Sequence, residues 1–113
     1  MNFLFKKKTI PDYFAEKRAV KRIAANLETR LSCGNMFYTG VVLNLSEKGM
    51  FISTRRFLPS NTTFLIIIRM EDKLLKIPAK VKRLTKTDSF YYGMGVELLT
   101  PPAEYLEFVE NIK

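Results

Sequence analysis

The chain has 113 residues, 47% of them hydrophobic, which suffices for one domain with a single core and no disulfide or metal to hold it together. The formal net charge is +8, with no histidine and one cysteine, so the commonest metal ligand and general base are missing and no internal disulfide can form. No apolar run reaches the roughly 18 residues of a membrane-spanning helix, and no signal-peptide pattern is present. These features predict a cytoplasmic protein without membrane insertion, metal site or cofactor.

The positive charge is concentrated near the N-terminus. Residues 1–30 carry eight Lys/Arg and three Asp/Glu, a net +5, which leaves +3 for the other 83 residues. A field of this sign attracts phosphate-bearing partners, whether nucleotide, RNA or an acidic protein surface. A basic tail that only aids solubility is the alternative interpretation.

Residues 1–15 differ in composition from the rest of the chain. They combine Phe3, Leu4 and Phe5 with three lysines at 6–8 and an Ile10-Pro11 pair, which disfavours a helix. We expect an extended or mobile N-terminal arm over 1–15, followed by one domain over 16–113. The arm is also a candidate contact for a partner protein.

The first part of the domain is predicted to be a β-hairpin. Residues 16–26 indicate a loop or a single turn, and the next run, 27–33, alternates apolar and polar residues as a half-buried strand does. Gly34-Asn35 suits a turn with positive φ, and 36–43 resumes strand-like sequence. Beyond it, Leu43 and Leu45 are expected to share one face and Asn44 and Ser46 the other.

The remainder predicts more strands and one helix. Strand-like runs cover 50–54, 62–70, 74–86 and 90–99. In the third of these runs, Ala79, Val81 and Leu84 alternate with Lys80, Lys82 and Arg83.

In the fourth run, glycines at 93 and 95 indicate a bulge or a close approach to the backbone. After two prolines, residues 103–112 predict an amphipathic helix packed on the strands. Its apolar stripe is expected to contain Tyr105, Val109 and Ile112, joined by Leu106 and Phe108. Six short strands and one helix indicate an antiparallel, barrel-like all-β domain.

Two short segments carry the candidate chemistry. Arg18 and Arg22 stand four residues apart ahead of the first strand, and a guanidinium can both stack on a base and bind phosphate or guanine. Asn44, Ser46 and Gly49 follow the second strand. Asn44 can read a base edge, Ser46 adds a hydroxyl, and Gly49 permits a sharp turn or close approach. Together they predict a ligand clamp.

These segments resemble the PilZ domain family, which pairs Arg-x-x-x-Arg before its first strand with Asp/Asn-x-Ser-x-x-Gly after its second. The resemblance extends over residues 16–112. It implies a six-stranded antiparallel β-barrel plus a C-terminal α-helix that binds the bacterial second messenger cyclic di-GMP. Arg18 and Arg22 would contact guanines and phosphates, while Asn44, Ser46 and Gly49 would hold a guanine.

One position departs from the family pattern. Many members carry arginine immediately before the first motif arginine, where it helps to bind a stacked pair of messenger molecules. This chain has Lys17 there, which keeps the charge without the planar group. Whether one or two molecules bind therefore stays open, and Lys17 and Lys21 are secondary candidates for ligand contact.

The resemblance implies a non-enzymatic receptor that switches a separate, unidentified effector protein when the arginine segment becomes ordered, in motility or biofilm regulation. One alternative is a basic β-barrel that binds RNA or DNA, although stacking aromatics are not obvious in the sequence. Another is a PilZ-like adaptor that binds only protein. An enzyme is disfavoured, because Ser46 as a nucleophile would have no histidine base.

Overall fold

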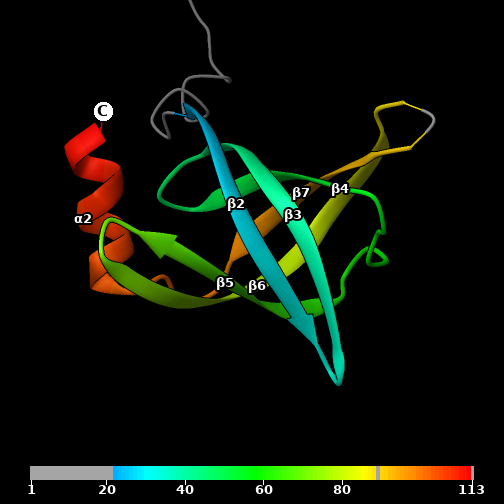
Figure 1. Cartoon of the computed structure of the whole chain (residues 1–113), viewed down its shortest axis with the longest axis horizontal. Helices are drawn as coiled ribbons and strands as arrows, with labels where there is room; N and C mark the ends of the chain where they lie inside the picture. The colour runs from blue at the N-terminus through cyan, green and yellow to red at the C-terminus, as the bar shows by residue number, and fades with distance from the viewer. Residues whose placement is uncertain (1–21, 89, 113) are drawn as a thin grey trace, which may run out of the picture.

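The structure, a computed structural model, describes residues 22–88 and 90–112. They form six strands and one helix, labelled as in Figure 1: β2 (Ile23–Cys33), β3 (Met36–Leu45), β4 (Gly49–Thr54), β5 (Thr63–Met70), β6 (Lys73–Lys86), β7 (Tyr92–Leu98) and α2 (Ala103–Ile112). The strands close into a barrel in the order β2-β3-β4-β7-β6-β5, with all neighbours antiparallel. The predicted six-stranded antiparallel barrel with a C-terminal helix is confirmed. The arm expected over residues 1–15 lies outside the described residues.

The first hairpin turns where the sequence predicts it, with Gly34 at a φ of 61°. However, β2 begins at Ile23, so the loop expected up to residue 26 is wrong for its last four residues. Ile23 and Ala24 pair with Leu45 and Asn44 on β3, and the register then shifts before Leu27. Side-chain burial still alternates through this shift, but the small Ala24 and Ala25 give the sequence little contrast between the two faces.

A second irregularity changes the faces of β3. The register with β4 shifts between Val42 and Asn44, which makes Leu43 the extra residue of a bulge. Leu43 is 40% exposed whereas Leu45 is fully buried, so the expectation that these two leucines share a face is wrong. The bulge re-aims the end of β3, where the candidate site begins.

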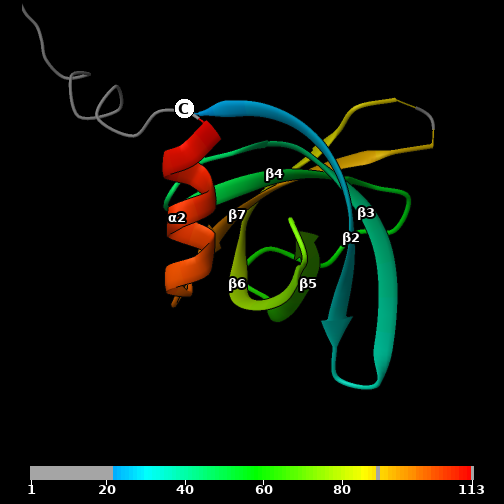
Figure 2. The same ribbon diagram turned by 60° about the vertical axis from the view of Figure 1, so that its left-hand side comes forward.

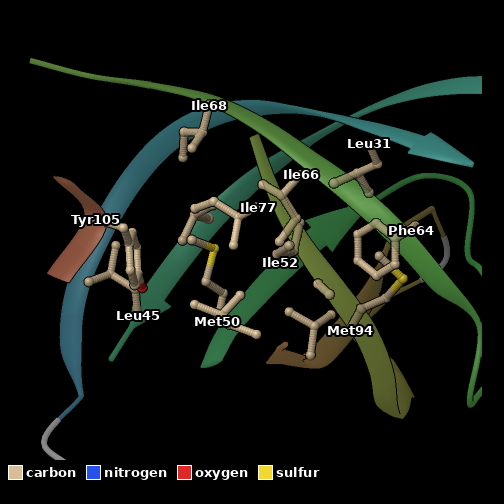
Figure 3. Close-up of a cluster of buried hydrophobic side chains, with 14 of the residues drawn as sticks. Leu31, Leu45, Met50, Ile52, Phe64, Ile66, Ile68, Ile77, Met94 and Tyr105 are labelled. Atoms are coloured by element: carbon tan, nitrogen blue, oxygen red, sulfur yellow. The ribbon is translucent and has the colours of Figure 1, made fainter. Parts of the chain in front are cut away.

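The inward side chains of all six strands and of α2 form one apolar cluster (Figure 3). Tyr105 and Val109 of α2 are fully buried in it, which confirms that the helix packs on the barrel. Leu106 and Ile112 are 39% and 40% exposed, so the buried stripe is narrower than expected. No helix among the described residues combines the length and apolar character needed to span a membrane.

The helix and the β6–β7 hairpin lie at opposite sides of the barrel. Figures 1 and 2 show α2 standing beside the start of β2, while the β6–β7 hairpin projects on the far side. The end of the barrel next to α2 therefore carries both the residue that precedes β2 and the end of β3.

Candidate functional site

The two predicted motif segments meet at this end of the barrel. Arg22 immediately precedes β2, and its Nη1 donates a hydrogen bond of 2.7 Å to Oδ1 of Asn44. The strand register explains the contact, because Ala24 pairs directly with Asn44. Arg22 is exposed and Asn44 is half-buried, so the pair lies on the outer surface of the barrel. A ligand in solution can reach both side chains.

The hydrogen bond also fixes the orientation of the Asn44 amide. Arginine has only donors, so the amide oxygen must face Arg22. The amide nitrogen keeps its two hydrogens and the oxygen keeps a second lone pair. Asn44 therefore retains both donor and acceptor capacity for the edge of a base.

Ser46 lies in the turn between β3 and β4, where its side chain has a local role. It is 1% exposed, and its hydroxyl oxygen accepts hydrogen bonds from the amides of Lys48 at 3.3 Å and Gly49 at 3.2 Å. Its own amide donates to the carbonyl of Gly49 at 2.9 Å. These bonds shape the turn that follows Asn44.

Gly49 is required by a close approach of the next strand. A Cβ at this position would lie 2.6 Å from the carbonyl oxygen of Val96 on β7 and 3.8 Å from Nη2 of Arg22. The first distance is too short for any side chain unless the backbone moves. The glycine thus lets the turn sit against β7 while the Arg22 guanidinium lies above it.

The helix is tied to the same turn by Tyr105, a contact that the sequence reasoning missed. The Tyr105 hydroxyl donates a buried hydrogen bond of 2.6 Å to the carbonyl oxygen of Ser46. Burial raises the pKa of Tyr105 well above its usual range, against a smaller opposing effect of the Arg22 charge. The hydroxyl therefore stays protonated and remains a donor. In sequence, Tyr105 was recognisable only as part of an apolar stripe.

Three of the predicted contact residues are not placed. Lys17, Arg18 and Lys21 lie outside the described residues, so the structure brings together Arg22, Asn44 and Gly49, with Ser46 beneath them. Within the described part of the chain, no group of three or more His, Cys, Asp or Glu residues could hold a metal ion.

A second surface feature, which the sequence did not indicate, is a group of aromatic and basic side chains around Arg55 and Tyr91. The guanidinium of Arg55 lies 6.0 Å from the ring centroid of Tyr91. A hollow of about 270 Å³ adjoins it, lined by Phe37, Tyr38 and Arg56 as well as Thr39 and Arg55. Phe37 is 64% exposed, so aromatic and basic groups do gather on this surface.

Comparison with protein families decides the identity of the domain. The family model of the PilZ domain matches residues 16–112, most of the chain. The chain belongs to the PilZ domain family. Comparison with curated proteins gives no match.

Solved PilZ structures share the fold at low sequence identity. The chain is similar to the inhibitor of motility MotI/DgrA of Bacillus subtilis, with 18% identity and a TM-score of 0.70, over 85% of this chain and 48% of that one. It is also similar to the PilZ domain of YcgR from Escherichia coli, solved with cyclic di-GMP, with 15% identity and a TM-score of 0.67, over 85% and 88% of the two chains.

The PilZ domain of CeSA, from a cellulose-synthesizing bacterium, is similar at 20% identity and a TM-score of 0.60, over 81% of this chain and 93% of that one. The chain spans about half the length of the Bacillus protein but nearly all of the two isolated PilZ domains. At these low identities, the similarity shows that this chain has the same fold as those proteins.

Proposed function

We propose that this protein is a non-enzymatic receptor for cyclic di-GMP, which binds on the outer face of the barrel between the arginine segment and the turn after β3. Membership of the PilZ family and the solved complex of the YcgR PilZ domain with cyclic di-GMP support the choice of ligand. The observation that carries the proposal is the hydrogen bond between Arg22 and Asn44. It joins the two segments that must act together on one ligand.

The chemistry of the pair fits a guanine nucleotide. Arg22 offers charged donors to phosphate or to the acceptors O6 and N7 of guanine, and Asn44 offers a donor pair with an acceptor beside it. Adenine presents a different pattern, with an amino donor where guanine has O6. The proposed clamp therefore prefers guanine to adenine.

We assign some motif residues to direct contact with the ligand and others to shaping the turn after β3. Arg18 and Arg22 would grip the ligand, with Lys17 and Lys21 adding charge, and Asn44 would read a guanine edge. The buried hydroxyl of Ser46 supports a role in shaping the turn more than in touching the ligand. Gly49 lets the turn approach the Val96 carbonyl of β7 beneath Arg22.

The output of the receptor is proposed to be the ordering of the segment from residue 16 to Arg22 over the bound nucleotide. A ligand shifts such an equilibrium only through contacts that exist in the closed state alone. The arginines of this segment are the groups able to make them. A separate effector protein would then bind the closed surface, in motility or biofilm control. The similar Bacillus subtilis protein is an inhibitor of motility, which supports motility by analogy.

Titration calorimetry of the full chain tests the proposal. We expect saturable binding of cyclic di-GMP and much weaker binding of cyclic di-AMP, which has the same phosphates and a different base. Folded protein that binds neither molecule would refute the proposed function. Equal binding of both would refute the guanine clamp.

The surface around Arg55 and Tyr91 favours a second candidate, a basic β-barrel that binds RNA or DNA. Exposed aromatics can stack bases while arginines neutralise phosphates, and such binding weakens steeply with salt. Binding of a single-stranded oligonucleotide that is lost in Arg55→Ala, and that cyclic di-GMP does not displace, would support this candidate. Absence of oligonucleotide binding at low salt would exclude it.

A further inference from the structure

A row of four residues crosses the outer face of the barrel from the proposed site. Asn44 on β3 pairs with Phe51 on β4, Phe51 pairs with Gly95 on β7, and Gly95 pairs with Arg83 on β6. Neighbouring strands lie about 4.8 Å apart, so the row spans roughly 14 Å from Asn44 to Arg83. The four strands adjoin in the barrel of Figure 1.

A bulge in β6 brings Arg83 into this row. Val81 pairs with Val96 and Arg83 pairs with Gly95, which leaves Lys82 as the extra residue. Val81 is fully buried, so without the bulge a residue two positions later would also point inward. Instead Arg83 is exposed, because the bulge re-aims it.

The side chain of Arg83 lies over Gly95 of β7, and the ring of Phe51 lies over Gly93 of the same strand. A Cβ at Gly95 would lie 3.4 Å from Nε and 3.7 Å from Nη2 of Arg83, so the guanidinium covers this glycine. A Cβ at Gly93 would collide with the ring of Phe51. Two glycines on the same strand thus make room for two planar groups that lie on the sheet.

The guanidinium of Arg83 is also not neutralised by a neighbour in the described residues. The ion pair on this part of β6 is made by Lys82 instead, whose Nζ lies 3.7 Å from Oε1 of Glu97. Within residues 22–88 and 90–112, the side chain of Arg83 makes no hydrogen bond or ion pair. An exposed guanidinium and an aromatic ring over neighbouring glycines of one strand offer a surface suited to a base.

We propose that Phe51 and Arg83 form a floor on which a purine base of the bound nucleotide stacks, next to Asn44 and Arg22. This inference rests on the proposed function and extends its site across β4, β7 and β6. Aromatic rings and the planar guanidinium both stack on bases, and Arg83 adds its charge. A lysine at position 83 would keep that charge and lose the plane.

Calorimetry with cyclic di-GMP tests the floor in four proteins: the wild type, Arg83→Ala, Arg83→Lys and the control Arg69→Ala. Arg69 is an exposed arginine on β5, which is not part of the row. We expect Arg83→Ala to weaken binding about tenfold, within the range found for stacked bases. Arg83→Lys should lose most of the same affinity, and Arg69→Ala should stay within about twofold of the wild type, as an exposed charge far from a ligand does.

The outcomes separate the two proposals. If the wild type binds and Arg83→Ala binds as tightly as Arg69→Ala, the floor is wrong while the receptor function stands. Full affinity in Arg83→Lys would overturn stacking on the guanidinium. If the wild type binds no cyclic di-GMP, the proposed function fails and the floor fails with it. Melting of each unliganded variant checks the fold, which the exposed position of Arg83 should leave intact.

Discussion

Arg22 and Asn44 are 22 positions apart in the chain, yet their side chains share a hydrogen bond of 2.7 Å on the barrel surface. This hydrogen bond holds one side chain from each of the two predicted motif segments next to the other. Preorganisation of this kind lowers the entropic cost of association.

Arg22→Ala should abolish or greatly weaken the binding of cyclic di-GMP and barely change stability. A hydrogen bond from Arg22 to the charged ligand would contribute about 1.5–3 kcal/mol to binding. An exposed pair such as Arg22 and Asn44 adds only about 0–1 kcal/mol to the stability of the fold. Calorimetry and urea denaturation measure the two effects, with Arg69→Ala as the control. A large loss of stability together with unchanged affinity would instead make Arg22 a structural residue.

Gly49→Ala should destabilise the barrel by about 1–3 kcal/mol, because the new Cβ meets a backbone carbonyl that cannot move alone. Gly95→Ala is the matched control on the neighbouring strand. There the new Cβ meets the flexible side chain of Arg83 at 3.4 Å, so the loss should be smaller. Equal midpoints in denaturant for the two variants would contradict the close approach at Gly49.

Ser46→Ala should cost about 1–3 kcal/mol, since it leaves two amides of the turn without their acceptor in a buried place. Ser53→Ala, at a half-buried position on β4, is the control and should have little effect. Urea denaturation gives both values. If Ser46→Ala kept full stability and lost only ligand affinity, its hydroxyl would be a ligand contact after all.

Tyr105→Phe should lower the free energy of unfolding by about 0.5–1.5 kcal/mol through loss of the bond to the Ser46 carbonyl. The pKa of Tyr105 is raised in the folded protein, so the unfolded chain releases this proton first. The stability difference between wild type and variant should therefore be constant below pH about 10 and shrink as the pH rises further. Denaturation midpoints at pH 7, 9 and 10.5 measure it. A difference that stays constant to the highest pH would contradict the buried hydroxyl.

The sequence predicts the barrel and its closing helix well because most of the strands alternate regularly and the turn at Gly34 has the residue that its φ requires. It fails at the bulge of β3, where alternation places Leu43 with Leu45 but the extra residue turns Leu43 outward. At the bulge of β6 the residue types already mark the change of face, because Arg83 joins the polar residues and Leu84 the apolar ones.

The residues of the candidate site were also predictable from the sequence, but their contacts were not. Arg22, Asn44 and Gly49 are recognisable as a motif, but their contact depends on a strand register that starts at Ile23. The burial of Ser46 and its bond to Tyr105 join residues 59 positions apart, which only the packed barrel brings together. The row formed by Phe51, Gly95 and Arg83 likewise depends on the pairing of β4, β7 and β6.

The central claim is that Arg22 and Asn44 hold the nucleotide, and heteronuclear NMR of the full chain tests it most directly. On saturation with cyclic di-GMP, we expect the side-chain NH₂ signals of Asn44 and the Nε–H signal of Arg22 to shift, while the Nε–H signal of Arg69 stays in place. Calorimetric binding with the Asn44 and Arg22 signals unmoved would place the ligand elsewhere and contradict the account.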